Sequence, residues 1–398
     1  MLELANRLLI SNRSHATELL PLFVSTFETI FAQENDADDA QIVGLKFPYL
    51  LERLVVTILR AVIHLYDVPD RTLRTQLMRS MELITSLPYS YTKEISSRIG
   101  CGASIVLRGC FLLFESPKEW FTIRNLLDVA ARHETGRSFV FDGIASLVEY
   151  AFPVVVDGKS VLNEIELSVN GCEAIRTLLL KFLDGAYEND LNYKLPSVLY
   201  MKRVYSQQPS RSHLQTSNYA SKGNSEQSVE WTKMVSVLYH DICRSDNMNT
   251  SKKGFESLQE VILSTKVDSI TDHQWLSLIE MACTDPPLTT QASRIDSLNL
   301  IERLFLTLVP KLSNKKENWA CLEKFTLNLA NIIAENLQSD RPSSLFEITV
   351  HTVTNMCNVM SMTGFGNGKE INFCSWVGET LMCELEKVGA AGGVASAN

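Results

Sequence analysis

The sequence predicts an all-α fold in which helical hairpins stack side by side as an α-solenoid. Apolar residues recur at helical spacing along most of the chain. Tryptophan also recurs at a constant interval, because Trp231, Trp275 and Trp319 are each 44 residues apart. Helical repeats of the HEAT and armadillo kind use about 40–47 residues for one hairpin, which cannot bury its apolar face without neighbours. The alternative is that the interval is a coincidence, since Trp120 and Trp376 do not follow it.

The first hairpin is predicted from its connectors. A helix over 15–32 ends at an acidic connector over 34–39. The next helix opens at Lys46-Phe-Pro48, where a proline in the first turn removes no needed N–H. Asp67-Val-Pro69 closes this helix, because the residue before a proline avoids the α region, and a partner helix then runs to about Leu87.

A long helix is predicted next, over 91–114, although Gly100 and Gly102 each weaken it by up to about 1 kcal/mol. Its successor has the clearest start in the chain: Ser116 as N-cap, proline at the first helical position and Glu119 at the third. Two more helices are predicted in this half, one after 133–136 and one from near Gly171. The expected core residues are Leu19, Leu20, Phe23, Phe27, Ile30, Phe31, Ile95, Ile99, Val106, Cys110, Phe114, Ile123, Leu126, Leu127, Ala130, Ile144, Leu147, Val148, Phe152, Ile175, Leu178, Leu179, Phe182 and Leu183.

The boundary between two arrays is predicted at 206–228, which is polar and rich in Ser, Gln and Asn. Such a segment buries too little apolar area to offset its ordering entropy, so a disordered linker is expected. It separates an N-terminal array over 1–205 from a C-terminal array over 229–388, and the tail 389–398 is expected to be disordered. The predicted helices of the second array cover 229–245, 254–265, 271–284, 288–309, 314–338, 342–361 and 371–388.

The tryptophans of the second array share a local context. Thr271 to Gln274 form a capping-box pattern before Trp275. Before Trp319, Asn314 is the expected N-cap, with Glu317 in the first turn. The apolar stripes expected to be buried are Met234, Val235, Leu238 and Ile242, then Leu278, Ile279 and Ala282, then Leu322, Phe325, Leu329, Ile332 and Ile333.

Composition excludes several classes of function. The 45% hydrophobic and 21% charged residues are ordinary for a folded soluble protein, and 44.7 kDa suits two domains or one elongated array. A net charge of −9 with a pI near 5.4 argues against a nucleic-acid partner. Nine scattered cysteines and no signal-peptide pattern predict reduced, mostly buried thiols of a cytosolic protein.

The apolar run Phe47 to Tyr66 is the candidate for membrane insertion. Glu52, Arg53, Arg60 and His64 interrupt it. A charge at the bilayer centre costs at least about 2.5 kcal/mol, so a buried solenoid helix is predicted and no transmembrane segment is expected.

Two glycine-containing motifs are weak candidates for phosphate binding. In Gly364 to Lys369 the glycines are one residue too close, and Glu370 stands where Ser or Thr would bind magnesium. Asp157 to Ser160 lacks the first glycine of that signature. The segment Val154 to Val161 is expected to be a loop between helices, with a small hairpin around Asp157-Gly158 as the alternative.

No residue is nominated for catalysis, for a cofactor or for a metal. His240 and Cys243 are one helical turn apart but lack a second ligand pair. The stripe formed by Phe346, Val353, Met356 and Met360 is expected in the core, with a partner groove as the alternative. The charges at 315–317 are expected to be solvated.

The order of these elements resembles a known family. The segments that carry the resemblance are Phe47–Leu65, Leu83–Leu87, Glu119–Trp120 with Leu126–Leu127, and Phe141–Leu147, then Trp231 with Val235 and Leu238, Phe255–Leu263, Ser297–Phe305 and Trp319. Over about residues 40–360 the chain resembles the homology-downstream regions of the large Golgi brefeldin-resistance Arf guanine-nucleotide exchange factors, which include the Gea and GNOM proteins. Helix order and dispersed aromatic and leucine positions carry the match.

The resemblance implies a part in loading Arf GTPases with GTP at early Golgi membranes, with the chain in the cytoplasm and peripherally bound to them. In that family the exchange activity lies in an upstream domain that no segment here resembles. The expected function is therefore a non-catalytic regulatory and membrane-targeting arm in ER–Golgi transport, with Arf, the membrane surface and other proteins as partners. The alternatives are a HEAT-type scaffold of another trafficking or nuclear-transport complex and an enzyme with a dispersed site.

Overall fold

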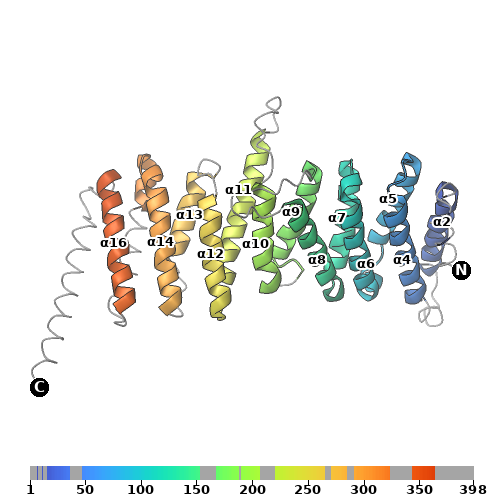
Figure 1. Cartoon of the computed structure of the whole chain (residues 1–398), viewed down its shortest axis with the longest axis horizontal. Coiled ribbons are helices and arrows are strands. Elements are labelled where there is room, and N and C mark those ends of the chain that lie inside the picture. Colours follow the sequence, from blue (N-terminus) through green and yellow to red (C-terminus); the bar gives the residue numbers. More distant parts are fainter. Residues whose placement is uncertain are drawn as a thin grey trace, which may run out of the picture. The chain divides into compact units, whose positions relative to one another are not determined.

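The computed structural model is helical throughout the part of the chain that it describes, and that part contains no strand (Figure 1). This confirms the predicted all-α solenoid fold. The described residues are 7, 11, 16–35, 47–152, 167–187, 190–206, 220–264, 270–284, 291–322 and 343–363.

The chain divides into two units, Met1–Leu214 and Gln215–Asn398. The division falls within the range 206–228 that was predicted to be a linker. Residues 207–219 lie outside the described part, whereas helix α11 already begins at Ala220. The sequence between 220 and 228 is polar but contains no proline, so nothing in it prevents a helix.

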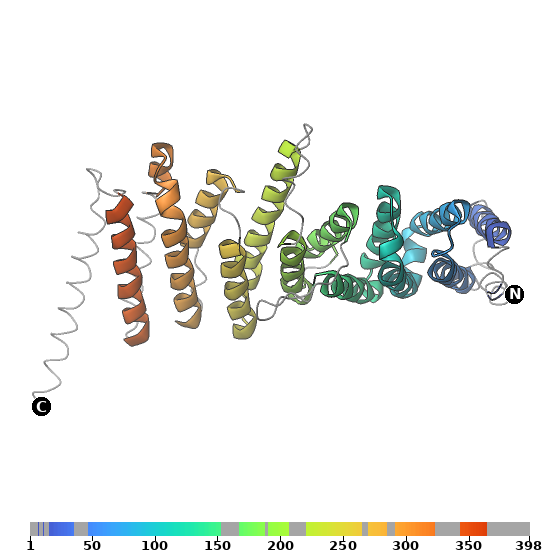
Figure 2. The same ribbon diagram turned by 45° about the horizontal axis from the view of Figure 1, so that its top comes forward.

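The first unit has two layers of helices. One layer contains α4, α6, α8 and α10, and the other contains α2, α5, α7 and α9. Figure 2 shows the two rows, with α4, α6 and α8 in the lower row and α5, α7 and α9 in the upper. The bounds are α2 Ala16–Asn35, α4 Phe47–Leu65, α5 Arg71–Thr85, α6 Tyr89–Cys110, η2 Phe111–Leu113, α7 Pro117–Ala131, α8 Glu134–Ala151, α9 Val169–Leu183 and α10 Leu191–Ser206.

The core of this unit lies between the two layers. All of the predicted core residues from Ile95 to Leu183 are buried. In α2, Leu20 is buried, whereas Leu19, also predicted as core, is only half-buried; the side chains of the predicted phenylalanines and Ile30 lie outside the described part. Trp120 is 2% exposed and packs edge-on against Phe114, with ring centroids 5.2 Å apart. Helix α10, which has Pro196 inside it, was not predicted as an element.

Helix α6 is the centre of the layer, because it packs against α4, α7 and α8. By length and hydropathy, Tyr89–Leu113 is a candidate membrane span, a property that central helices of layered folds share. Its exposed stripe carries Glu94, Arg98 and Arg108, while its other sides are covered by three neighbouring helices. Packing in the core therefore accounts for its apolar composition.

Glycines let α6 and α8 approach each other at backbone distance. A Cβ at Gly100 would lie 2.7 Å from the carbonyl oxygen of Gly136, and one at Gly143 would lie 2.5 Å from Ser104 Oγ. The Ser104 hydroxyl donates to the carbonyl of Phe139 on the facing helix at 2.6 Å. The glycine that weakens α6 in isolation is thus required by its neighbour. Gly136 also belongs to the first turn of α8, which begins at Glu134, earlier than predicted.

Substitution of Gly100 by alanine is expected to destabilise the first unit by about 1–3 kcal/mol, because the added methyl group meets backbone atoms that cannot move aside. Gly109 is the matched control on the same helix, since a Cβ there meets nothing within 4 Å. Gly109→Ala is expected to leave stability unchanged or raise it by up to about 1 kcal/mol. Urea denaturation followed by circular dichroism checks both variants, and equal behaviour of the two would contradict the close-packing argument.

The second unit continues the hairpin pattern. Helix α14 packs against α12, α13 and α16. The bounds are α11 Ala220–Val237, a π-helical turn η4 over Leu238–Ile242, α12 Met248–Ser264, α13 Asp272–Thr284, α14 Gln291–Leu312, the 3-10 turn η6 over Lys316–Asn318, and α16 Ser343–Thr363. The predicted core residues of these elements are buried wherever their side chains are described, including Val353, Met356 and Met360.

The tryptophan interval is a structural repeat. The rings of Trp231 and Trp275 meet at 4.8 Å with an interplanar angle of 68°. Next to them, Gln274 Nε2 donates to Thr232 Oγ1 at 2.8 Å. At the far end of the same helices, the Tyr239 hydroxyl donates to the carbonyl of Ala282 at 3.2 Å. Trp231 and Trp275 therefore contact each other from equivalent positions of successive hairpins, so this step of the interval reflects how the hairpins pack.

The third tryptophan follows a different local plan from the one predicted. The N-cap of its turn is Lys315, which makes no side-chain capping bond, so the expected cap at Asn314 is wrong. Asn318 supplies the polar contacts instead, because its amide donates to Asp272 at 3.2 Å and to the carbonyl of Leu312 at 3.1 Å. Trp319 is half-buried, and its Nε1 donates to a backbone carbonyl one turn earlier.

Two other predictions on local structure can be compared directly. The capping box at 271–274 is confirmed, because Thr271 N donates to Gln274 Oε1 at 3.1 Å and Gln274 N donates to Thr271 Oγ1 at 3.4 Å. The charges at 315–317 were expected to be solvated, and all three side chains are exposed; Lys315 also forms an exposed ion pair with Asp272, at 2.6 Å. The predictions on 154–161, 364–369, 371–388 and 389–398 fall on residues outside the described part.

Candidate interaction surface

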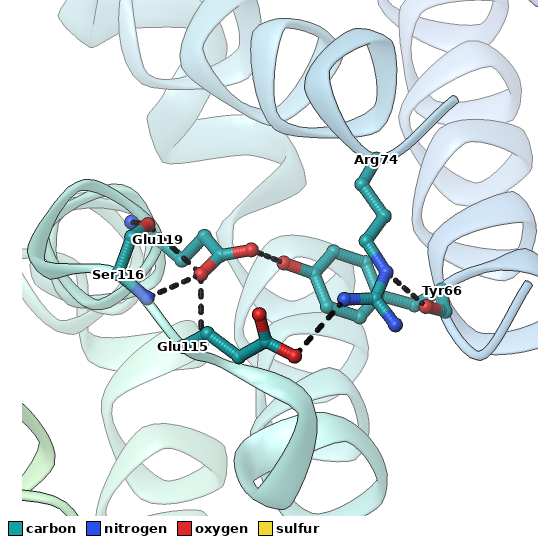
Figure 3. A network of polar contacts seen from close by, with 5 residues as sticks. All are labelled: Tyr66, Arg74, Glu115, Ser116 and Glu119. Atoms are coloured by element: carbon teal, nitrogen blue, oxygen red, sulfur yellow. Dashed lines mark hydrogen bonds and ion pairs between the residues drawn. The ribbon is translucent and has the colours of Figure 1, made fainter. Parts of the chain in front are cut away.

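A polar network joins the first two complete hairpins of the first unit (Figure 3). Glu119 forms the predicted capping box at the start of α7, accepting from Ser116 N at 2.6 Å. Its other carboxylate oxygen accepts a short hydrogen bond from the hydroxyl of Tyr66, just beyond α4. Arg74 of α5 donates to the Tyr66 carbonyl at 3.2 Å and pairs with Glu115 at 3.5 Å. The network therefore connects α4, α5 and α7.

The ionisation of this network is set by burial and by its own hydrogen bonds. Burial disfavours the charged form of Glu119, but the hydrogen bonds from Tyr66 and Ser116 outweigh it and lower the pKa of the carboxyl group. Burial raises the pKa of the Tyr66 hydroxyl, and the bond to the Glu119 carboxylate raises it further. The tyrosine thus stays a donor and the glutamate an acceptor near neutral pH, which suits a fixed structural contact.

A second network centres on Asp128 of α7, which is 6% exposed. Its carboxylate accepts from Lys181 Nζ of α9 at 2.5 Å, from the Tyr187 hydroxyl at 2.6 Å and from Arg132 at 2.7 Å. Burial opposes ionisation, but these three donors outweigh it and lower the pKa of Asp128. The Tyr187 carbonyl in turn accepts from Arg137 at 2.8 Å.

The side chains of these two networks are engaged in contacts within the protein. Both oxygens of Asp128 and of Glu119 accept hydrogen bonds, from the neighbouring hairpin and from Ser116 and Arg132 nearby in the chain. Within the described ranges, no group of three or more His, Cys, Asp or Glu is placed to hold a metal ion. His240 is exposed while Cys243 is buried, so these two side chains do not share a site. The two glycine motifs at 157–160 and 364–369 lie outside the described residues.

Cysteine placement shows no activated thiol among the described residues. Cys110, Cys172 and Cys243 are buried, and Cys321 is exposed. Burial raises the pKa of the Cys110 thiol to about 11, and that of Cys243 is raised for the same reason. A raised thiol pKa disfavours the nucleophilic thiolate.

In the layer formed by α2, α5, α7 and α9, three cations form ion pairs with carboxylates of an adjacent helix. Arg79 pairs with Glu28 at 3.1 Å, and Lys118 pairs with Glu82 at 3.3 Å. Lys181 is bound by Asp128. Each of these pairs joins a helix to the next one in the same layer, so these cations are neutralised by the solenoid itself.

The opposite layer has a different surface over α4 and α6. Arg53, Arg60 and Arg108 are exposed, and no carboxylate in the described part of the chain pairs with any of them. Exposed apolar side chains lie on the same stripes: Tyr49 is 56% exposed, and Leu112, one turn beyond Arg108, is 59% exposed. We call this surface the α4–α6 face; it consists of Tyr49, Leu50, Arg53, Arg60, Ile105, Arg108 and Leu112.

Sequence reasoning did not single out this face. In the sequence analysis, Arg53 and Arg60 were considered only as charges that interrupt an apolar run. The sequence does contain a pattern that could have identified the face: positions 49, 53 and 60 follow helical spacing, which places them on one stripe of α4. Whether those arginines have partners depends on the neighbouring helix, which local patterns do not specify.

Comparisons with known proteins leave the family open. No protein family and no curated protein matches the sequence. Among solved structures, a "Circular tandem repeat protein with novel repeat topology and enhanced subunit contact surfaces" is similar, with 12% sequence identity and a TM-score of 0.25. That match covers 98% of this chain and 84% of the other, and with so low a TM-score it carries no argument about function.

Replacement of Asp128 by asparagine is expected to lower the free energy of unfolding by about 2–3 kcal/mol at pH 7, because three donors lose a charged acceptor. A carboxyl group whose pKa is lowered by folding stabilises the fold above its unfolded pKa of about 3.9, and this is lost as pH falls through the lower folded pKa. The difference between wild type and Asp128→Asn should therefore shrink below about pH 4.

Urea denaturation at pH 7 and pH 3 measures this difference. Asp142→Asn is the control, because Asp142 is an exposed carboxylate on α8 and its loss should change stability by less than about 0.5 kcal/mol. A loss for Asp128→Asn that is the same at both pH values would show that packing, not ionisation, holds this site.

Proposed function

We propose that this chain is a non-catalytic, regulatory and membrane-targeting arm of a Golgi Arf guanine-nucleotide exchange factor that acts in vesicle-mediated transport. The proposal rests on the resemblance between residues 40–360 and the downstream helical regions of that family. The α-solenoid fold is consistent with such a region. In this proposal the chain is cytoplasmic and binds peripherally to early Golgi membranes, with Arf GTPases and other proteins as partners.

The observation that favours binding over catalysis is the contrast between the polar networks and the α4–α6 face. The buried carboxylate of Asp128 and the half-buried carboxylate of Glu119 accept hydrogen bonds both from the neighbouring hairpin and from residues next to them in the chain. The exposed arginines of the α4–α6 face have no carboxylate partner within the described residues. Solenoid proteins bind through such extended helical surfaces. This contrast supports an interaction arm, and the resemblance supports the Arf system as its setting.

The second candidate function is a HEAT-type scaffold of another trafficking or nuclear-transport complex. The same surface and fold favour it, because they specify binding without specifying a pathway. Affinity purification of the full chain from cells separates the two candidates. Recovery of Arf or Golgi proteins supports the first, whereas recovery of coat, karyopherin or kinase subunits without them supports the second.

Liposome flotation tests the Arf assignment directly. The full chain is expected to float with liposomes that carry membrane-anchored, GTP-bound Arf, and to do so more than with liposomes that carry the GDP-bound form. In the same preparation, nucleotide release from Arf should stay at its spontaneous rate, because the proposed role includes no exchange activity. Absence of flotation with both Arf forms, together with no binding to a family exchange domain, would count against the assignment. Turnover by this chain alone would refute the non-catalytic role.

A further inference from the structure

We propose that the α4–α6 face is the docking site for an acidic amphipathic helix of a partner protein. The partner is defined by its chemistry. It is a helix in which each turn carries an aliphatic side chain, such as leucine, next to a glutamate or an aspartate. The inference rests on the interaction-scaffold part of the proposed function and is independent of its Golgi part. Three properties of the face support it: its charge, its apolar positions and its width.

The face carries more exposed arginines than carboxylates: Glu52 pairs with Arg98, and Glu94 is exposed one turn before Arg98, but neither forms an ion pair with Arg53, Arg60 or Arg108. Arg60 makes no polar contact with another described residue, and Arg108 makes one long hydrogen bond, at 3.4 Å, to the carbonyl of Ser104. The guanidinium of Arg53 lies 5.2 Å from the ring centre of Tyr49, which holds the charge over an aromatic surface without neutralising it. Arginine binds carboxylates through two parallel hydrogen bonds, so acidic side chains are the complementary ligand.

The apolar positions alternate with these arginines. Ile105 of α6 is 40% exposed and precedes Arg108 by three residues, and Leu112 of the following 3-10 turn η2 is 59% exposed. A Cβ at Gly109 meets no atom within 4 Å, so the surface beside Arg108 is open. Tyr49 and Leu50 add apolar area at the start of α4. A helix with apolar anchors at i, i+3 and i+7 matches such a row.

The width of the face distinguishes a helix from a membrane. Packed helices lie about 8–10 Å apart, and one further helix of about 10–12 Å diameter fits over α4 and α6. A bilayer is far wider and would also cover α8, which packs on the other side of α6. Helix α8 exposes Glu134, Asp142 and Glu149. These carboxylates repel anionic lipid headgroups, so a flat bilayer that covers α4, α6 and α8 together is disfavoured.

An exposed ion pair between these two helices fits the same geometry. Arg98 of α6 pairs with Glu52 of α4 at 2.7 Å, which shows that a carboxylate between the two helices reaches an arginine on this face. Glu52 forms its ion pair with Arg98. Among the described residues, no carboxylate forms such a pair with Arg60 or Arg108. The partner helix supplies those carboxylates.

Fluorescence anisotropy with a synthetic peptide tests the proposal on the full chain. The probe is a labelled peptide of about 15 residues, long enough for about four helical turns, with leucines at helical spacing and glutamates beside them. A twin peptide carries lysine in place of each glutamate. The full chain is expected to bind the glutamate peptide at least tenfold more tightly than the lysine peptide.

Charge reversal locates the site. Arg60→Glu combined with Arg108→Glu is expected to weaken binding of the glutamate peptide at least tenfold. The matched control is Arg71→Glu, an exposed arginine at the start of α5 in the other layer, which should leave binding unchanged. Leu112→Ser is the second test, because it removes an apolar anchor without changing charge and is expected to weaken binding several-fold. Circular dichroism establishes that each variant is folded before it is used.

Three outcomes would overturn the proposal: no binding of the glutamate peptide, equal binding of both peptides, or unchanged binding by the folded double variant. A further experiment measures binding of the full chain to phosphatidylcholine vesicles with and without phosphatidylserine. Binding to the phosphatidylserine vesicles that is lost in the double variant would assign the face to a membrane instead. Arf-dependent flotation should persist in the double variant, so failure of this inference and failure of the Arf assignment are distinguishable.

Discussion

Burial of one hairpin's apolar stripe against the next hairpin is the interaction on which every other feature of both units depends. Helix α6 illustrates it, because its sides are covered by α4, α7 and α8, and its glycines allow backbone contact with α8. Polar contacts obey the same constraint: Tyr66 reaches Glu119, Asp128 reaches Lys181 and Thr232 reaches Gln274, each across about one repeat. Each hairpin thus completes its core and satisfies its buried polar groups only through its neighbours.

This arrangement decides which groups are left for function. A carboxylate that holds two hairpins together is desolvated and saturated, so its ionisation serves the fold. In the layer containing α5 and α7, Arg79 and Lys118 form ion pairs with carboxylates of adjacent helices. The α4–α6 face is where exposed charge and apolar area remain together without a partner within the described residues. These unpaired arginines and exposed apolar side chains are therefore the groups of this surface that can bind another molecule.

Local sequence patterns predicted most of the architecture and little of the surface. Helix spacing and the caps at Ser116 and Thr271 predicted element type and position, because these signals act within one or two turns. The close approach at Gly100, the pairing of Lys315 with Asp272 and the isolation of Arg60 could not be predicted, since each depends on a residue about 35–45 positions away. The tryptophan interval was the exception, because there the long-range register repeats in the sequence itself. The Arf setting depends on the resemblance, and no comparison supplies independent support.

The most direct test of the central claim compares one hairpin with three. Residues 89–132 contain α6 and α7 alone, whereas residues 47–187 contain the same hairpin between its neighbours. If neighbours supply the burial, the isolated hairpin should be largely unfolded by circular dichroism, and the longer fragment should be helical and lose its structure in one cooperative urea transition. A stable, cooperatively folded 89–132 fragment would contradict the account, because its apolar faces would then need no neighbouring hairpin.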